Sequence, residues 1–293
     1  MKSIIIPASV TTIGSQCFKN CVALKTVTIM STLTKIDEYA FQHCSQLSTI
    51  DYRGTDDVTT CSSSTVFNNA STSFEINVPP NYNSDTFCGL SITKPVVSKT
   101  GTCGSDCTYY LYDSGLLLIE GTGPMEDYTW KHSGEYYSSS PWGSLSIRDS
   151  VKRVEIRDGI TTVGHYAFNR CSSITSVILG NTLTEIKGES FWGCTSMTCI
   201  TVKSTTLNIL GVAFFNTGLK TFVFYGSTEP KYGISSSCSC SDGTTHSSCP
   251  VFFCDTTLKN VYVPSSYAGS TSSFCGESVT LTKVDDLDQY SYC

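Results

Sequence analysis

The chain has 293 residues, of which 40% are hydrophobic and only 15% are charged, and its formal net charge is -6. This acidic balance and the lack of any run of Lys or Arg argue against a protein that binds nucleic acid through its phosphates. No apolar stretch reaches the roughly 18 residues that a membrane-spanning helix requires, so we expect no membrane span.

A pattern of apolar residues with a period of 23 residues runs through the first part of the chain. Ile13, Phe18, Cys21 and Leu24 return as Ile36, Phe41, Cys44 and Leu47. A fixed period with apolar residues at fixed positions is typical of a solenoid, in which each coil buries its apolar side against its neighbours. We expect this first array to cover residues 1–94 and to end in a half-coil at Val78-Pro79, since proline suits the end of a strand.

Each coil is expected to be mainly β. Val27 and Ile29 fall on one side of a short strand, and Thr26 and Thr28 fall on the other. Tyr39-Ala40-Phe41 then predicts a tight helical or 3₁₀ corner that turns Phe41 inward. A coil of 23 residues leaves no room for a long helix beside two strands, and it falls in the length range of leucine-rich repeats.

The N-terminus begins inside a coil, because Lys2 to Ile6 lies one period before Lys25 to Ile29. No secretory leader is visible before this strand-like stretch. The end of a solenoid normally needs a polar capping unit. We therefore expect that the chain is part of a longer protein, or that its uncapped first coil stacks on another chain.

Residues 95–150 do not follow the repeat. Tyr109 to Tyr112 and Leu116 to Ile119 flank Asp113-Ser114-Gly115, which predicts a β-hairpin with glycine at the turn. In the aromatic loop that follows, Tyr128 and Trp142 are expected to cover the first coil of a second array. The alternative is a binding site in which exposed rings stack on sugars or on a protein partner. Its candidate residues are Trp130, Tyr136 and Tyr137.

The repeat returns in residues 151–293, which we assign to the second array. Val163, Phe168, Cys171 and Ile174 are followed one period later by Ile186, Phe191, Cys194 and Met197. A Cys-rich insertion at about residues 229–250 interrupts this array, which then ends in a half-coil at Val263-Pro264, as the first array does. The predicted core residues of the two arrays are Phe18, Phe41, Phe168, Phe191, Cys21, Cys44, Cys171 and Cys194.

Two stretches carry a family resemblance. VTTIGSQCFKNCVALKTVTI (residues 10–29) and ITTVGHYAFNRCSSITSVIL (residues 160–179) resemble the BspA-like, or Treponema-type, leucine-rich repeat, and DSGLLLIEGTGPMEDY (residues 113–128) is similar to the hairpin that precedes such arrays. The resemblance implies a leucine-rich-repeat solenoid. It also implies a surface or secreted protein that adheres to host cells, matrix proteins or other microbes, and it brings no catalytic motif.

The chain contains 16 cysteines. Those at the repeat position are expected to be free and buried, since free cysteine packs as a small hydrophobe. In an oxidising compartment we expect disulfides between Cys61 and Cys88, between Cys103 and Cys107, and between Cys275 and one of Cys240, Cys249 or Cys254. Cys238, Cys240, Cys249 and Cys254, with His246 among them, match no common zinc-site spacing, so we predict no metal.

Catalysis has little support in the sequence. The four histidines are His43, His132, His165 and His246, and two of them fall at variable repeat positions that are usually exposed corners. The motifs of serine hydrolases, zinc proteases and phosphate-binding loops are absent. We predict no catalytic residues, no cofactor and no enzymatic activity.

The outward side of the strands is the remaining candidate for a binding site. Its central row consists of Ile5, Thr28, Asp51, Glu155, Ile178, Thr201 and Val223. A flat, modestly apolar surface suits protein contact, although Thr, Ile and Val are also good strand formers.

These observations predict a non-enzymatic binding or adhesion protein. It would present an extended repeat surface to host or microbial surface proteins, to matrix or to glycans, at the cell surface or after secretion. The alternative is an intracellular scaffold in the cytoplasm, whose cysteines all stay reduced. The sequon Asn69-Ala70-Ser71 separates the two, because a glycan on Asn69 would place the chain in the secretory route.

Overall fold

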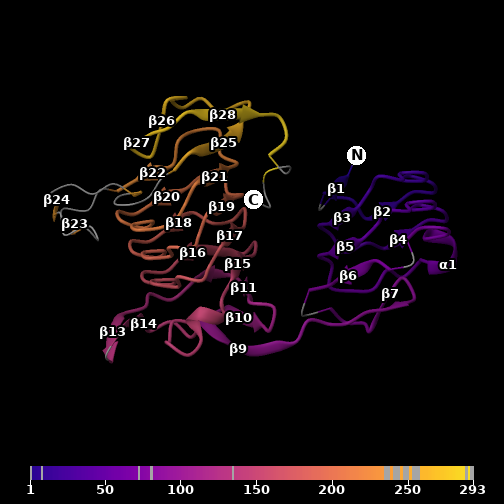
Figure 1. Ribbon diagram of the computed structural model, residues 1–293, viewed down its shortest axis with the longest axis horizontal. Coiled ribbons are helices and arrows are strands. Elements are labelled where there is room, and N and C mark those ends of the chain that lie inside the picture. Colours follow the sequence, from indigo (N-terminus) through magenta and orange to yellow (C-terminus); the bar gives the residue numbers. More distant parts are fainter. Residues whose placement is uncertain are drawn as a thin grey trace. The chain divides into compact units, whose positions relative to one another are not determined.

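The computed structural model describes residues 2–7, 9–71, 73–79, 82–133, 135–233, 238–239, 245–246, 251–252, 258–287 and 290. The chain divides into two compact units, Met1–Val96 and Val97–Cys293 (Figure 1). Each unit has its own apolar core. In both units short strands are stacked coil upon coil, which confirms the predicted mainly β solenoid of leucine-rich-repeat type.

In the first unit, four strands form a parallel sheet in the order β1-β3-β5-β6: β1 (Ser3–Ile6), β3 (Thr26–Ile29), β5 (Thr49–Tyr52) and β6 (Glu75–Asn77). On the other side of the coils β2 (Thr12–Ile13) pairs with β4 (Lys35–Ile36), also in parallel. The helix α1 (Ser63–Val66) lies in the insertion after β5. The unit ends in an antiparallel hairpin of β7 (Thr86–Phe87) and β8 (Leu90–Ser91).

The second unit contains a sheet of nine strands, ordered β28-β25-β21-β19-β17-β15-β11-β10-β9. Their bounds are β9 (Val97–Gly104), β10 (Cys107–Tyr112), β11 (Leu116–Gly121), β15 (Arg153–Ile156), β17 (Ser176–Leu179), β19 (Cys199–Val202), β21 (Thr221–Phe224), β25 (Asn260–Pro264) and β28 (Leu281–Val284). Strand β10 is antiparallel to both of its neighbours, β9 and β11, and all later neighbours in the sheet are parallel.

A second row of short parallel strands forms the other side of these coils, in the order β12-β16-β18-β20-β22. They are β12 (Gly123–Pro124), β16 (Ile160–Val163), β18 (Glu185–Ile186), β20 (Asn208–Ile209) and β22 (Lys231–Tyr232). The remaining elements are the hairpin β13 (Trp130–Ser133) with β14 (Glu135–Ser138), the 3₁₀ turn η1 (Arg148–Ser150), the pair β23 (Cys238–Ser239) with β24 (Thr245–His246), and the hairpin β26 (Ser273–Phe274) with β27 (Glu277–Ser278).

Between the two rows of strands, the corner of each coil is a series of turns. In the corner around Phe41, backbone hydrogen bonds such as Cys44 N to Phe41 O at 3.3 Å keep the three-residue spacing of a 3₁₀ helix. Tyr39 and His43 adopt left-handed φ values of 61° and 60°, however. Left-handed residues end a right-handed helix, so the predicted helical corner is built from successive turns instead.

The repeat phenylalanines stack into a ladder inside each unit. Phe168 lies 5.0 Å from Phe191, and Phe191 lies 5.2 Å from Phe214, between ring centroids and with nearly parallel rings. In the first unit Phe41 stacks on Phe18 at 5.2 Å. The ladder residues Phe41, Phe168 and Phe191 are fully buried, whereas Phe18 in the outer coil is half-buried.

The repeat cysteines lie next to the ladder as free thiols. Cys44, Cys171 and Cys194 are buried, and Cys21 in the outer coil is half-buried. The Cys194 thiol donates to the Phe168 carbonyl of the preceding coil at 3.1 Å, and Cys44 donates to Phe18 in the same way at 3.2 Å. Burial raises the pKa of Cys44 to about 11 and that of Cys171 to about 12. These thiols therefore stay protonated and unreactive at neutral pH.

The hairpin and the aromatic loop cover the first coil of the second array. Trp142 is fully buried, stacks on Phe168 at 5.4 Å and donates its indole N–H to the Ala167 carbonyl at 2.8 Å. Tyr109 and Tyr128 pack edge-on against the same indole. Strand β11 pairs directly with β15, so the capping segment continues the sheet of the second unit.

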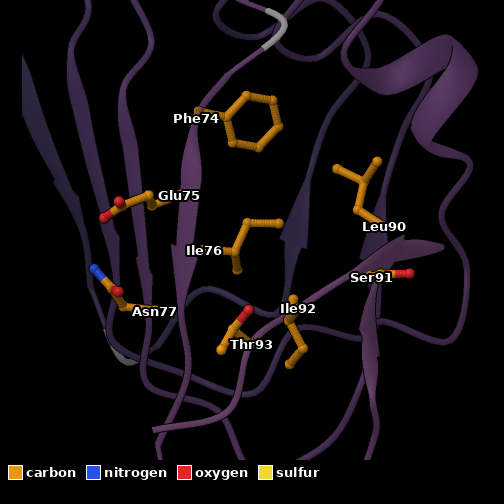
Figure 2. Close-up of a pocket in the computed structure, with 8 residues that line it drawn as sticks. All are labelled: Phe74, Glu75, Ile76, Asn77, Leu90, Ser91, Ile92 and Thr93. Carbon is orange, nitrogen blue, oxygen red and sulfur yellow. The ribbon is translucent and has the colours of Figure 1, made fainter.

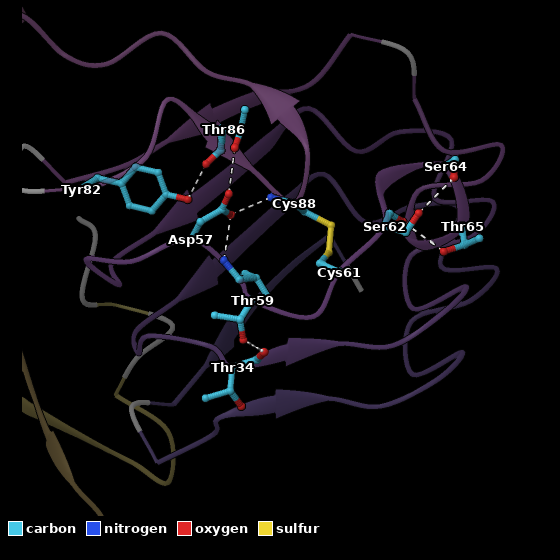
Figure 3. Close-up of a disulfide and its surroundings, with 11 residues drawn as sticks. Thr34, Asp57, Thr59, Cys61, Ser62, Ser64, Thr65, Tyr82, Thr86 and Cys88 are labelled. Atoms are coloured by element: carbon cyan, nitrogen blue, oxygen red, sulfur yellow. Dashed lines mark hydrogen bonds between the residues drawn. A yellow bond between two sulfur atoms is a disulfide. The ribbon is translucent and has the colours of Figure 1, made fainter.

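The end of the first unit is held by a disulfide between Cys61 and Cys88 and by the carboxylate of Asp57 (Figure 3). Asp57 accepts hydrogen bonds from the backbone N–H of Val58 and of Cys88, at 2.8 and 2.9 Å, and from the Thr86 hydroxyl at 2.9 Å. The hairpin β7–β8 is thereby fixed to the insertion that follows β5.

Two of the predicted disulfides are present and one is not. Cys61 pairs with Cys88 and Cys103 pairs with Cys107. The predicted bond to Cys275 is wrong, because Cys275 is a free, buried thiol. Asp57 and Glu229 occupy equivalent positions, since Glu229 accepts a hydrogen bond from the Cys275 N–H at 2.6 Å as Asp57 does from the Cys88 N–H. Four residues after Asp57 the first unit has Cys61, whereas four residues after Glu229 the second unit has Gly233. Cys199 is also disulfide-bonded, and no pairing of Cys199 was predicted.

Candidate binding face

The outward row predicted from the strands is in register in both units. In the first unit Ile5, Thr28 and Asp51 are neighbours across β1, β3 and β5. In the second unit Glu155, Ile178, Thr201 and Val223 are neighbours across β15, β17, β19 and β21, with Tyr262 of β25 next in line. The period alone therefore placed these residues correctly side by side.

Three of these predicted binding residues have almost no exposed surface. The exposed fraction is 5% for Thr28, 1% for Thr201 and 0% for Val223. The expectation that they form an open surface is wrong. Thr201 lies between Ile178 and Val223 in the register, and Val223 is itself fully buried.

The end of the chain also folds onto this face. The ring of Tyr290 stacks on Tyr262 at a centroid distance of 4.0 Å, and Leu287 is buried. The part of the outward face next to Val223 is therefore occupied by the protein itself.

The open part of the face in the second unit lies over β15 and β17, because on β11 the neighbour of Glu155, Leu118, is only 1% exposed. Arg157 stands between two carboxylates, with Nη1 3.6 Å from Oε2 of Glu120 and Nε 3.7 Å from Oε1 of Glu155. Ile178, which lies next to Glu155 in the register, is half-buried and so still partly exposed. This combination of an apolar side chain and a charged group that is already held in place suits contact with another protein.

Tyr112 borders this open area. Its hydroxyl is buried and has no hydrogen-bond partner among the residues that the structure describes. Burial, and after it the nearby carboxylate of Glu120, raises the pKa of Tyr112. The phenol is therefore neutral at physiological pH and keeps a donor that the described residues leave unused.

In the first unit the row ends in a polar pair. The Asn77 side-chain amide donates to the Asp51 carboxylate at 2.7 Å, and Ile5 on β1 is half-exposed. This face is shorter than that of the second unit and more polar at β6.

The aromatic loop separates into buried and open residues. Trp130 on β13 is 43% exposed and stacks on Trp192 at 6.3 Å, and Tyr137 on β14 is half-buried. Tyr136 lies on β14, but its side chain is outside the part of the chain that the structure describes. Trp192 has the same repeat position as Phe215, which it meets edge-on at 5.5 Å, so the exposed ring of Trp130 extends an aromatic row on the coils.

A polar cluster lies where the loop meets the coils. Asp127 accepts a hydrogen bond from the backbone N–H of His165 at 2.9 Å and binds the Lys187 ammonium at 2.7 Å. The Tyr166 hydroxyl donates to the Glu189 carboxylate at 3.0 Å, and burial raises the pKa of both side chains, to about 12 for Tyr166. These contacts tie the loop to the coils and join neighbouring coils, and we assign them that structural role.

Metal ligation and membrane insertion receive no support from the parts of the chain with assigned structure. Within them, no group of three His, Cys, Asp or Glu side chains is placed to hold a metal ion. Of the cysteines considered for zinc, Cys240, Cys249 and Cys254 lie outside the described residues. In the same described ranges, no helix has the length and apolarity needed to cross a bilayer.

Comparison with known proteins gives a family match. A family model described as "BspA type Leucine rich repeat region" matches residues 1–111 and 146–241, in 6 copies. No curated protein matches the chain.

Three solved structures are similar. A leucine-rich repeat protein from Eubacterium ventriosum has 23% identity and a TM-score of 0.42, over 63% of this chain and 44% of that one. One from Bacteroides ovatus has 17% identity and a TM-score of 0.29, over 96% and 69%. A leucine rich cell surface protein from Faecalibacterium prausnitzii has 18% identity and a TM-score of 0.26, over 78% and 80%. This chain thus spans less than half of the Eubacterium protein.

Proposed function

Because the chain belongs to the BspA-type leucine-rich repeat family, we propose that it is a non-enzymatic binding or adhesion protein. Its partners are surface or matrix proteins of a host or of other microbes, and their glycans. The protein acts at the cell surface or after secretion.

The observation that carries this proposal is the open part of the outward face in the second unit. There Ile178 is partly exposed on a parallel sheet beside Glu155 and Arg157, whose charges are already held by each other and by Glu120. A partner would bury an apolar side chain against charges that need little reordering, which lowers the entropic cost of association. Trp130 and Tyr137 offer a second patch, suited to stacking on sugar rings.

The binding experiment introduces a lysine at two different positions and compares the two variants. Ile178→Lys should weaken binding to immobilised matrix proteins or mucin glycoproteins about tenfold or more, because a charge replaces an apolar contact at the centre of the face. Tyr232→Lys is the matched control, since Tyr232 is an exposed apolar side chain on the opposite row of strands. Both are measured by surface-based binding with the full chain. If wild type and both variants bind equally well, the outward face is not the binding site.

Disulfides support the extracellular location, because they persist in oxidising compartments and are rare in the cytosol. In protein taken from its source with free thiols blocked at lysis, Cys61, Cys88, Cys103, Cys107 and Cys199 should resist alkylation until a reductant is added. The buried thiols such as Cys171 should be alkylated as soon as the chain is denatured. Peptide mapping by mass spectrometry distinguishes the two groups. Alkylation of all 16 cysteines without reductant would favour the alternative, an intracellular scaffold in the cytoplasm.

A further inference from the structure

The last strand of the second unit has no counterpart among the described residues of the first unit. The two units end alike: β6 corresponds to β25, since Val78-Pro79 matches Val263-Pro264, and the hairpin β7–β8 corresponds to β26–β27, since Phe87-Cys88-Gly89 matches Phe274-Cys275-Gly276. In the second unit the chain then returns as β28, which pairs in parallel with β25. In the first unit β6 is the edge of its sheet.

The residues after the hairpin explain the difference. Counting on from the matching glycines, Lys94 and Pro95 stand where the second unit has Leu281 and Thr282. Proline has no N–H to donate to a neighbouring strand. Lys94 does not pack inward as Leu281 does, but forms an ion pair with Asp85 at 2.9 Å. The chain therefore leaves the position beside β6 open.

A groove of about 490 Å³ lies at this position (Figure 2). Phe74 and Ile76 point into it from one side, and Leu90 and Ile92 line the other. All four are half-buried. The counterpart of Ile76 in the second unit is Val261, which lies beside Leu281 in the register and is 0% exposed. The groove is thus the place of the missing strand, with its apolar walls open.

The backbone of β6 has the polarity that an added parallel strand needs. The Glu75 N–H donates to the Ser48 carbonyl at 2.9 Å, on the side of β5. In a parallel ladder the peptide groups of successive residues point to opposite sides, so the N–H and C=O of Ile76 face the groove. On β25 the same edge is used: the Ser265 N–H donates to the Val284 carbonyl at 2.9 Å.

One side-chain contact of β28 indicates a further residue that a strand in the groove would carry. In the second unit the ammonium of Lys283 on β28 donates to the backbone carbonyl of Tyr267 at 2.6 Å. Tyr82 occupies the position of Tyr267 in the first unit. A lysine two residues after the leucine-like side chain would therefore find an acceptor there as well.

We propose that the groove beside β6 binds an extended segment of a partner protein, which adds to the sheet as a parallel strand. The segment places a Leu-like side chain next to Ile76 and a Lys two residues later, as β28 does on β25. This is recognition by strand addition, in which main-chain hydrogen bonds give affinity and side-chain pockets give selectivity. It does not depend on the outward face, so either proposal can fail alone.

The test uses the full chain and a fluorescent peptide with the sequence VTLTKVDD, which is that of residues 279–286. We expect saturable binding by fluorescence anisotropy. Methylation of the peptide nitrogen at the Thr that follows Leu should weaken it about tenfold or more, because that N–H faces the Ile76 carbonyl in this register. Methylation of the preceding Leu nitrogen, which points away from β6, is the matched control and should have a smaller effect.

Variants of the protein provide the second arm. Ile76→Pro removes the N–H that faces the groove, at an edge where proline is tolerated, and should weaken binding about tenfold or more. Ile76→Val keeps both the N–H and the apolar surface and should bind nearly as wild type does. Circular dichroism checks that both variants are folded. If Ile76→Pro does not fold, the methylated peptides still test the proposal. Absence of saturable binding, or binding that Ile76→Pro and the methylated peptide leave unchanged, overturns the proposal. Concentration-dependent self-association that Ile76→Pro abolishes, without peptide binding, also overturns it, in favour of a second copy as occupant.

Discussion

Replacement of Phe191 by alanine should lower the free energy of unfolding of the second unit by about 3–5 kcal/mol. Phe191 is fully buried and stacks on Phe168 and Phe214, one in each adjacent coil. The substitution leaves a cavity between two coils, and the flanking coils are held apart by their strand ladders, so they close it only in part.

This loss can be measured in the intact chain. All 3 tryptophans lie in the second unit, so their fluorescence during urea unfolding reports that unit alone. Tyr232→Ala serves as the control, since Tyr232 is exposed on β22 and its removal should change the midpoint little. If Phe191→Ala unfolds at the same urea concentration as wild type, the stacked ladder does not carry the stability that we assign to it.

The second large effect is expected at the cap. Trp142→Ala should also destabilise the second unit by about 3–5 kcal/mol. The substitution removes a fully buried ring, its hydrogen bond to the Ala167 carbonyl, and the surface that covers Phe168. Without that cover the first coil of the array exposes its apolar side, and the ends of solenoids need such a cap.

Trp130→Ala is a matched control for this variant, because it deletes the same side chain from the same capping segment. Trp130 is exposed on β13, and we expect a change of about 1 kcal/mol or less. Unfolding is followed through the two tryptophans that remain. Equal losses for the two variants would mean that Trp142 is not the residue that closes the array.

The sequence predicted those parts of the fold that depend on period. The 23-residue spacing put Glu155, Ile178 and Thr201 in one row, and the structure pairs them in that register. The hairpin and Trp142 were predicted as a cap because a solenoid end requires large apolar groups, and Trp142 packs on the first ladder ring. The row consists of contacts between neighbouring coils, which the repeat encodes directly, whereas the cap follows from the need to cover the first coil.

Contacts that skip coils, or that occur once, were not predictable in this way. Val223 is buried at an outward position, beside a Tyr262 ring that stacks on Tyr290 near the end of the chain. No repeat position indicates that Tyr290 folds back over the sheet. Cys275 was expected in a disulfide with one of Cys240, Cys249 or Cys254, but its thiol is free, and Gly233 stands where the first unit has Cys61.

The stacked coils have one more consequence, for how such a chain can change its length. The coil that contains Phe168 and the coil that contains Phe191 present the same apolar ring, the same thiol and the same strand edges to the next coil. Inserting or deleting a whole unit of this kind would create no new type of contact in the interior. Genetic recombination between coils can therefore lengthen or shorten the exposed surface while each junction stays chemically the same.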